Sequence, residues 1–317
     1  MTSSPRVLVL AGGLSHEREV SLRSGSRVAE LLRGAGCEVE VRDVDADLLP
    51  ALRDARPDVV WPLLHGATGE DGAVRDVLEL LGLPYVGARP DACRRAFDKP
   101  VAKSLVAGAG LSTPQGVALP HSVFRELGAA AVLAALVARI GLPLAVKPAR
   151  GGSALGVTVV HEAERLPRAM VDCYGYGDVA LVERGVAGRE VAVSVLDDGS
   201  GPRALPAVEI VPAQGATYGY DARYTAGGTE YFTPARLDDA AARAAAEAAV
   251  TAHTCLGLRD LSRTDLVVDD DGRPWFLETN VAPGMTELSL LPQALTATAE
   301  DPGAVYRSLV ELAADRG

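Results

Sequence analysis

The chain has 317 residues, of which 48% are apolar and 23% are charged. This composition is typical of a globular protein with sequence enough for two or three domains, and it excludes a disordered chain. The formal net charge of −11 argues against nucleic-acid binding, which draws most of its affinity from Lys/Arg contacts to phosphate. A small anionic ligand is still allowed, because a few local cations can dominate one cleft.

The cysteines and the apolar runs exclude further classes. The four cysteines lie far apart without a CxxC pair, so we predict buried free thiols rather than a disulfide framework or a zinc site. The N-terminal apolar run is too short for a secretory signal, and no stretch of about 18 apolar residues predicts a membrane span. We therefore expect a cytoplasmic protein that binds neither membranes nor nucleic acids.

Strand-like and helical segments alternate over the first part of the chain. A short apolar run at residues 6–10 ends at Gly12-Gly13, as a buried strand entering a loop does. Helical spacing at 18–35, an alternating strand at 38–44, an apolar run at 58–64 and helical spacing at 74–81 follow. This alternation predicts a parallel α/β sheet, which we assign to a first domain, residues 1–88.

The middle of the chain predicts a small α+β unit, residues 89–184. Its expected elements are helices at 98–110, 129–140 and 162–173 and strands at 144–147, 156–160 and 179–183. The last part, residues 185–317, predicts strands at 190–196 and 204–211 and a helix at 238–256. Between them runs a loop, residues 212–236, and a loop this long in a compact domain is usually a functional lid or disordered.

The most informative local feature is an acidic hairpin predicted over residues 263–280. Two strand-like runs flank Asp271-Gly272, a dipeptide typical of two-residue hairpin turns. Such a turn places Asp265 directly across from Glu278, with their Cβ atoms about 4.5–5.5 Å apart. Two carboxylates facing each other at this distance are destabilising unless a positive charge lies between them, so the hairpin indicates a cation site.

The side chains beside this pair point to the kind of cation. The same register places Arg263 across from Asn280 on the same face, and no histidine or cysteine is nearby. Oxygen ligands alone favour Mg²⁺ or Mn²⁺ over zinc, and magnesium usually completes its shell with substrate phosphates. The alternative is a solvated hairpin with an acidic wet face. Gly284, which follows a proline, favours the first interpretation because its N–H can approach a ligand closely.

A glycine-rich segment, KPARGGSALG at residues 147–156, is a candidate phosphate cradle. A strand ends at Lys147, and the backbone N–H groups of the following turn can bind an anion. It is not a Walker A motif, because the GK[ST] order is missing. A hairpin turn with a surface lysine is the alternative, and Lys99 alone is a weak signal. The GxGxxG spacing of dinucleotide folds is absent after Gly13.

Taken together, the motifs resemble those of the D-alanine–D-alanine ligase family. The segments that carry the resemblance occur in the family's order and span nearly the whole chain: GGLSHEREVSLRSG (12–25), LLHGATGEDG (63–72), KPARGGSALGV (147–157), YDARY (220–224) and RTD…FLETNVAPGMTELSLLP (263–292). The resemblance implies an ATP-grasp fold with three domains, the first of them a Rossmann-like parallel sheet, and a nucleotide held between the second and third.

The resemblance also implies a two-step reaction. The carboxylate of one D-alanine takes the γ-phosphoryl group of ATP and becomes an acyl phosphate. The amine of a second D-alanine then attacks the carbonyl, and phosphate leaves from a tetrahedral intermediate. Phosphoryl transfer mainly requires positioning and charge neutralisation, and the oxyanion requires donors aimed at it. The cofactors implied are ATP, as substrate, and two Mg²⁺ or Mn²⁺ ions.

Residue roles follow from the same resemblance. It assigns substrate contacts and catalysis to Glu17, Ser153, Tyr224, Arg263 and Gly284, with His65, Ser289 and Leu290 at the amino-acid sites. It assigns nucleotide contacts to Lys99, Lys147, Glu183, Val186, Glu190, Arg223, Phe276 and Leu277. It assigns the metal to Asp265, Glu278 and Asn280. Without the resemblance, most of these are ordinary polar or core residues.

One position departs from the family pattern. The lid residue before the tyrosine, usually a lysine, is Arg223 here, which can still meet a phosphate through a bidentate contact. Tyr224 resembles the dipeptide-forming members rather than those that use D-lactate. The main alternative is a related ligase of specialised metabolism or inhibitor resistance that uses another donor or acceptor, such as D-serine, D-lactate or a specialised building block. A third hypothesis is a nucleotide-binding regulatory protein without turnover.

The resemblance also implies a homodimer.

Overall fold

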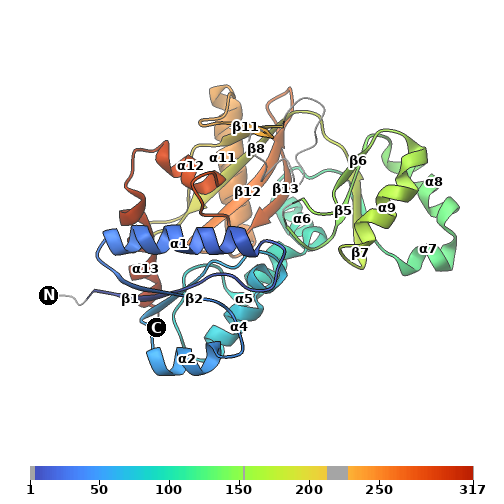
Figure 1. Cartoon of the computed structure of the whole chain (residues 1–317). Helices are drawn as coiled ribbons and strands as arrows, with labels where there is room; N and C mark the ends of the chain where they lie inside the picture. Colours follow the sequence, from blue (N-terminus) through green and yellow to red (C-terminus); the bar gives the residue numbers. More distant parts are fainter. Residues whose placement is uncertain (1–3, 153, 213–227, 317) are drawn as a thin grey trace.

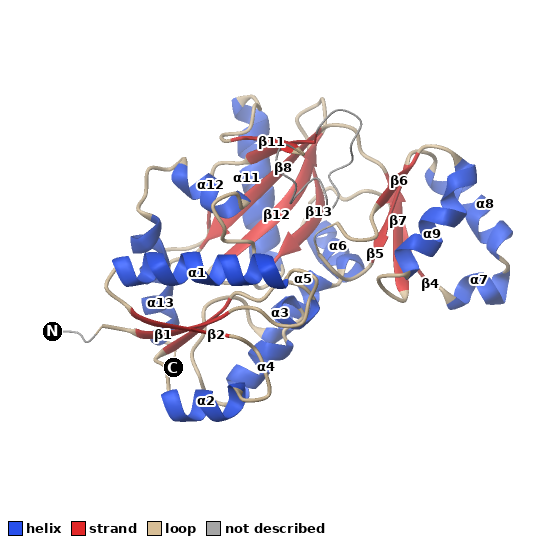
Figure 2. Cartoon of the chain, in the orientation of Figure 1, coloured by secondary structure: helices blue, strands red, loops and turns tan. Residues whose placement is uncertain are grey.

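A computed structural model describes residues 4–152, 154–212 and 228–316. It is a mixed α/β structure in which two antiparallel sheets and one parallel sheet are each covered by helices (Figures 1 and 2). Among the described residues, no helix is both long and apolar enough to cross a membrane. The predicted α/β class is confirmed.

The N-terminal part forms the parallel sheet that the sequence predicts. Its three strands run in the order β2-β1-β3. They are β1 (Arg6–Leu10), β2 (Glu38–Arg42) and β3 (Val59–Pro62), and the helices around them are α1 (Arg18–Gly34), α2 (Leu48–Ala55), α3 (Ala67–Glu70) and α4 (Ala73–Leu80). Along α1, Val20, Val28 and Leu32 are buried at helical spacing, so the helix turns one apolar face to the core.

The middle of the chain forms a four-stranded antiparallel sheet with the order β4-β7-β5-β6. Its elements are β4 (Gly116–Pro120), α7 (Ser122–Leu127), α8 (Ala129–Ile140), β5 (Leu144–Pro148), β6 (Thr158–Val160), the 3-10 helix η1 (Ala163–Arg165), α9 (Leu166–Tyr174) and β7 (Val179–Arg184). The core between helices and sheet includes Leu144, Val146, Leu166 and Met170. In Figure 2 this unit stands to one side of the rest of the molecule.

The C-terminal part forms the largest sheet, with the order β11-β10-β8-β12-β13 and β9 paired to β8. Its strands are β8 (Arg189–Leu196), β9 (Arg203–Ala204), β10 (Val208–Pro212), β11 (Thr229–Phe232), β12 (Leu261–Val268) and β13 (Pro274–Asn280). The helices that pack near it are α5 (Pro90–Phe97), α6 (Lys99–Gly108), α11 (Asp239–Cys255), α12 (Leu290–Thr296) and α13 (Pro302–Ala314).

Helices distant in sequence tie the sheets together. Helix α13 returns to the N-terminal sheet and packs on α1, where the Tyr306 and Trp61 rings meet edge-on with centroids 5.6 Å apart. Helix α13 and strand β1 therefore lie on the same side of the molecule (Figure 1). Helices α5 and α6, which the prediction groups with the central unit, share a hydrophobic cluster with α11 and the C-terminal sheet. The bounds of the three domains remain predictions.

Two predicted features of the C-terminal part are wrong. The single strand expected at 204–211 is two strands, β9 and β10, separated at Leu205–Ala207 around Pro206, which has no N–H to donate to a ladder. The loop expected over 212–236 contains strand β11, which pairs antiparallel with β10 from Glu209↔Phe232 to Pro212↔Thr229. A run with alternating β-forming side chains (Thr229, Tyr231) is the signal for β11.

Candidate active site

The acidic hairpin has the predicted pairing but not the predicted turn. Asp265 pairs with Glu278 and Arg263 with Asn280, whereas from Leu266 onward the register is shifted by one residue. The turn is longer than two residues because the Asp269 carboxylate accepts the N–H groups of Asp271 and Arg273, which closes a wider loop. A bulge at Leu277 removes this offset. The longer turn and the bulge therefore compensate each other, and Asp265 pairs with Glu278 as predicted.

The carboxylates of this hairpin are held by cations. Arg263 donates from Nε and Nη2 to the two oxygens of Asp265 at 2.7 and 2.9 Å, and both side chains are buried. Glu278 is half-buried and its Oε2 lies 3.2 Å from the Lys99 Nζ. A bidentate contact fixes the guanidinium plane as well as its distance, so Arg263 is held rigidly on the cavity face of β12.

The glycine-rich loop is fastened to the start of α6. The Lys99 N–H donates to the Ala149 carbonyl at 2.9 Å, and the Lys99 Nζ donates to the Gly151 carbonyl at 2.6 Å. Arg150 donates to Asp98, whose carboxylate also caps α6 at the Val101 N–H. These contacts place the loop beside β13 of the other sheet, so the lysine-bearing turn and the acidic hairpin face one cavity.

A buried cluster of two lysines and one carboxylate lies behind this loop. Glu183 on β7 pairs through Oε1 with the Lys147 Nζ and through Oε2 with the Lys103 Nζ at 3.0 Å, and Lys103 also donates to the Phe276 carbonyl at 3.0 Å. Burial and the neighbouring Lys147 charge lower the pKa of Lys103 to about 8. Burial opposes ionisation of Glu183, but the two lysines outweigh it and lower its pKa.

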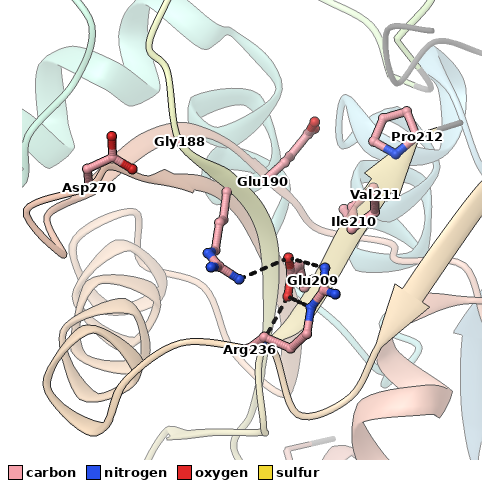
Figure 3. Close-up of a pocket in the computed structure, with 9 residues that line it drawn as sticks. Gly188, Glu190, Glu209, Ile210, Val211, Pro212, Arg236 and Asp270 are labelled. Atoms are coloured by element: carbon pink, nitrogen blue, oxygen red, sulfur yellow. Dashed lines mark hydrogen bonds and ion pairs between the residues drawn. The ribbon is translucent and has the colours of Figure 1, made fainter. Parts of the chain in front are cut away.

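The glycine-rich loop and the acidic hairpin line one cavity. Its charged lining consists of Lys99, Lys147, Arg150, Glu190, Asp265 and Glu278, and the glycine loop and Leu277 complete it. Glu190 also lines a second, larger groove of ≈ 800 Å³ at the open end of strands β8 and β10 (Figure 3). The two spaces are therefore neighbours, and together they offer room for a ligand with a charged end and an uncharged body.

The second groove has its own internal ion pair. Glu209 is buried and accepts Nε and Nη2 of Arg236 at 2.9 and 2.8 Å and the Arg236 N–H at 3.0 Å, and Arg189 approaches it at 3.5 Å (Figure 3). These contacts lower the Glu209 pKa, chiefly through the Arg236 guanidinium. Because Glu209 is bound on both oxygens, its charge is neutralised within the protein.

The opposite side of the site is acidic and belongs to the N-terminal part. Glu17, at the start of α1, and Glu70, at the end of α3, are both buried. Glu70 accepts the Gly66 N–H at 3.1 Å, and burial, followed by the charge of Glu17, raises its pKa to about 8. The neighbouring position 69 requires glycine, because a Cβ there would lie 2.0 Å from the Leu64 carbonyl oxygen.

A hydrogen-bonded chain links this acidic side to the C-terminal loop. The Met285 N–H donates to Ser24 Oγ at 3.1 Å, Ser24 Oγ meets His65 Nε2 at 3.3 Å, and His65 Nδ1 meets the Ala282 carbonyl at 3.0 Å. A carbonyl only accepts, so Nδ1 carries the proton and Nε2 accepts from Ser24. Burial lowers the His65 pKa, which keeps the ring neutral and fits this tautomer.

The segment after the hairpin is tightly folded around Gly284. A Cβ on Gly284 would lie 2.7 Å from Ser289 Oγ, which the Thr286 N–H and hydroxyl approach at 3.0 and 2.8 Å. The predicted residues Gly284 and Ser289 are therefore neighbours. Leu290 is buried in the cluster beneath α12.

Other predicted residues lie elsewhere or outside the described chain. Phe276 turns its ring into the core shared with α11, where the Lys103 Nζ lies 5.8 Å from the ring centroid, and its carbonyl accepts from the same Nζ. Val186 is half-buried in the connector between β7 and β8, two residues before Gly188 of the larger groove, and is not among the residues that line either cavity. Ser153, Arg223 and Tyr224 lie outside the described residues.

The prediction missed Lys103 and Glu70. Lys103 follows Lys99 by four residues, which places both on one face of a helix, and that spacing is a usable signal. Glu70 lies in the segment HGATGEDG, where the glycines indicate a tight loop, but nothing in the sequence alone shows that its carboxyl group is buried.

The carboxylate pair suits a hard cation. Asp265, Glu278 and Asn280 offer only oxygen atoms, which fits Mg²⁺ or Mn²⁺; the Asn280 Oδ1 already accepts the Ala282 N–H at 2.8 Å. In the described parts of the chain, no group of three or more His, Cys, Asp or Glu side chains is placed to hold a metal. The donor set is thus an incomplete shell that fits an ion shared with bound phosphates.

The architecture defines an ATP-grasp protein, in which a glycine loop on one antiparallel sheet faces carboxylates on another. Family models described as "D-ala D-ala ligase C-terminus" and "D-ala D-ala ligase N-terminus" match residues 105–312 and 48–88. A D-alanine–D-alanine ligase of Anaeromyxobacter sp. (strain K) is 43% identical over 288 residues, 91% of this chain and 90% of that protein. The chain belongs to the D-alanine–D-alanine ligase family.

Solved structures agree with this membership. The VanG D-Ala:D-Ser ligase of Enterococcus faecalis superposes with a TM-score of 0.81 at 26% identity, covering 98% of this chain and 99% of that one. The D-alanine–D-alanine ligase of Bacillus anthracis, solved in complex with ATP, superposes with a TM-score of 0.80 at 24% identity, covering 99% and 98%; this second likeness bears on the fold alone.

Proposed function

We propose that this protein is an ATP-dependent ligase that joins two molecules of D-alanine through a D-alanyl phosphate, supplying a peptidoglycan precursor in the cytoplasm. One observation carries the proposal: the lysine-bearing glycine loop and the Asp265–Glu278 pair face the same cavity. Relatives named D-alanine–D-alanine ligase over most of the chain support it. The homodimer expected from the family is part of the proposal.

Binding of the triphosphate is assigned to the basic side of the cavity. Lys147 and Lys99 supply point charges, and the N–H groups of the glycine loop supply further donors. Glu183, Leu277 and Glu190 border the nucleoside end. Lys103 keeps Glu183 neutralised, so that Lys147 is able to turn to a phosphate. A metal ion held by Asp265, Glu278 and Asn280 would neutralise charge on the phosphates when bound.

Substrate activation and amide formation are assigned to the junction of the two sides. Glu17 binds the ammonium group of the first amino acid. The carboxylate of that amino acid then points towards the triphosphate and accepts the γ-phosphoryl group. The amine of the second amino acid then attacks the acyl carbon, and phosphate leaves. Arg263, fixed by Asp265, and the Gly284 N–H are the donors for the oxyanion, while Ser289 holds the second carboxylate.

The test is a substrate panel. Purified protein with ATP and Mg²⁺ is given D-alanine, L-alanine, D-serine or D-lactate, singly and in pairs, and release of phosphate is recorded together with the product mass. We expect phosphate release and D-alanyl-D-alanine with D-alanine alone, and its loss when EDTA removes the metal. The absence of phosphate release with D-alanine would contradict the assignment.

A second candidate is a D-alanine–D-serine ligase. The structural likeness to the Enterococcus faecalis VanG D-Ala:D-Ser ligase favours including this acceptor. In the panel, it predicts that D-serine competes with D-alanine at the second site and gives the mixed dipeptide as the main product. A main product of D-alanyl-D-alanine in equimolar mixtures would exclude it.

A further inference from the structure

A buried carboxyl group in the N-terminal part has no role in the scheme above. The Glu70 side chain is only 6% exposed. Its Oε1 accepts the Gly66 N–H at 3.1 Å, whereas within the described chain no donor is within hydrogen-bond distance of its Oε2. This oxygen is therefore open to a hydrogen-bond donor from a ligand, although the side chain as a whole is mostly buried.

The unpartnered oxygen faces the glycine loop. A Cβ built on Gly152 would lie 3.7 Å from Glu70 Oε2, 3.8 Å from Glu17 Oε2 and 3.9 Å from Glu70 Oε1. Among the described residues other than Gly152 and its two chain neighbours, these are the three heavy atoms nearest to that point. All three are carboxylate oxygens, so Glu17 and Glu70 converge on one spot beside the loop from two different elements.

The charged groups around Glu70 do not supply the missing partner. Arg263 on β12 acts on it from a distance but donates to both oxygens of Asp265, and Glu278 on β13 adds a further negative charge. From the elements packed on α3, the Arg75 guanidinium of α4 donates to the Gly69 carbonyl, and Cys93 of α5 is a buried thiol whose pKa is raised.

This environment sets the charge of Glu70. Burial, with the Glu17 charge as the next cause, raises its pKa to about 8. At neutral pH, Glu70 is therefore mostly a neutral carboxylic acid beside an acidic neighbour. A cation that enters between the two groups would favour the ionised form, so Glu70 would give up its proton to solvent as the cation binds.

We propose that Glu70 is a second receptor for the α-ammonium group of the first amino acid, which lies between Glu70 and Glu17. The inference rests on the proposed function, and it adds a specificity residue to it. An ammonium group has three N–H donors, more than one carboxylate oxygen satisfies. A hydroxy acid at the same position brings no positive charge, so it would neither favour ionisation of Glu70 nor pair with Glu17. The two carboxyl groups therefore select amino acids over hydroxy acids in the first position.

The substitution that separates this role from a structural one is Glu70→Gln. Glutamine keeps the volume and the Oε1 acceptor for the Gly66 N–H but cannot ionise. We expect the first-site affinity for D-alanine, measured by calorimetry with a non-hydrolysable ATP analogue and Mg²⁺, to fall at least tenfold. The affinity for the nucleotide should stay within twofold. Glu19→Gln, on the exposed face of α1, is the matched control.

Proton release provides a readout that a merely structural role would not move. Binding of D-alanine to the wild type at pH 7 is measured in buffers of different ionisation enthalpy, and we expect net release of a proton that Glu70→Gln abolishes. Wild-type affinity and unchanged proton release in the variant would overturn the proposal. If the variant fails to fold, as judged by circular dichroism, the wild type still decides: binding without proton release overturns it. Failure of the proposed function is distinct, because the wild type itself would then not bind D-alanine.

Discussion

The two sides of the candidate active site carry opposite charges. The side formed by the central unit and α6 presents Lys103 and Lys147 around one buried carboxylate, Glu183, and Lys99 beside Glu278. The side formed by the N-terminal part presents two buried carboxyl groups and a neutral histidine. Both sides pay a desolvation cost, and each matches one end of the proposed reaction: anionic phosphates on one side and an ammonium group on the other.

The two sides also differ in how their charges are compensated. The lysines on the basic side already have carboxylate or carbonyl partners in the protein. Glu70 on the acidic side has an oxygen without a described donor and a pKa raised to about 8. The basic side is thus already paired within the protein, whereas the acidic side keeps one carboxyl oxygen open for the proposed substrate.

The largest expected effect is at Arg263, where the two sides meet. Arg263→Ala removes the oxyanion donor and leaves the buried Asp265 without its bidentate partner. We expect kcat for dipeptide formation to fall roughly 100- to 1,000-fold, measured by phosphate release, while ATP binding measured by calorimetry is retained. Arg263→Lys keeps a charge but not the bidentate geometry, so it should be intermediate. Retained turnover in Arg263→Ala would break the assignment.

A buried ion pair outside the candidate active site gives a prediction for stability alone. Arg316 contacts both oxygens of the buried Asp260 at 2.6 and 2.8 Å, and the Gly87 N–H donates to the same carboxylate at 2.6 Å. Arg316→Ala should lower the free energy of unfolding by about 3–5 kcal/mol, since it leaves the buried Asp260 charge without its cation. Urea unfolding measures this. A loss of kcat per folded molecule would show that the pair also shapes the cleft.

On the basic side, Lys103→Met tests whether Lys103 frees Lys147 for phosphate. Without Lys103, Glu183 holds Lys147 more strongly, and KM for ATP should rise roughly tenfold, about 1.4 kcal/mol, with a smaller change for D-alanine. Steady-state kinetics with both substrates measures this. Lys103→Met combined with Glu183→Gln should recover part of the loss, because the competing carboxylate is gone. No change in KM for ATP would remove Lys103 from the nucleotide site.

On the acidic side, the smallest effect is a pH dependence of stability. The folded-state pKa of Glu70 is raised from 4.5 to about 8, so between these values the folded protein holds a proton that the unfolded chain releases. Its contribution to stability is complete below pH 4.5 and is lost as pH rises through 8. Glu70→Gln should match the wild type in Tm at pH 5 and exceed it at pH 8.5, by about 2–4 °C per kcal/mol gained. Equal differences at both pH values would contradict the raised pKa.

Much of the fold follows from local patterns in the sequence. The helix predicted over 129–140 matches α8, and the alternation of strands and helices in the first domain gives the parallel sheet. The pairing of Asp265 with Glu278 was predicted from a turn that does not exist. It holds because the longer Asp269 turn and the Leu277 bulge offset each other, and a bulge has no signature in side-chain alternation.

What local patterns miss is created by tertiary packing. Lys103 and Glu70 matter because distant elements bury them: Lys103 meets Glu183 across α6 and β7, and Glu70 meets Glu17 across α3 and the start of α1. The Phe276 side chain lies in the core shared with α11. The sequence does not show which face of β13 packs against that helix. Strand β11 forms by pairing with the edge of β10. That tertiary contact is not visible in the sequence, where the glycines and tyrosines of residues 212–236 favour a loop.

The most direct test of the two-sided cleft is a crystal structure with D-alanine, Mg²⁺ and a non-hydrolysable ATP analogue. The account predicts the phosphates beside Lys99 and Lys147 and the ammonium nitrogen of one D-alanine between Glu17 and Glu70. An amino acid bound with its ammonium away from both carboxyl groups, or a triphosphate away from the glycine loop, would contradict it.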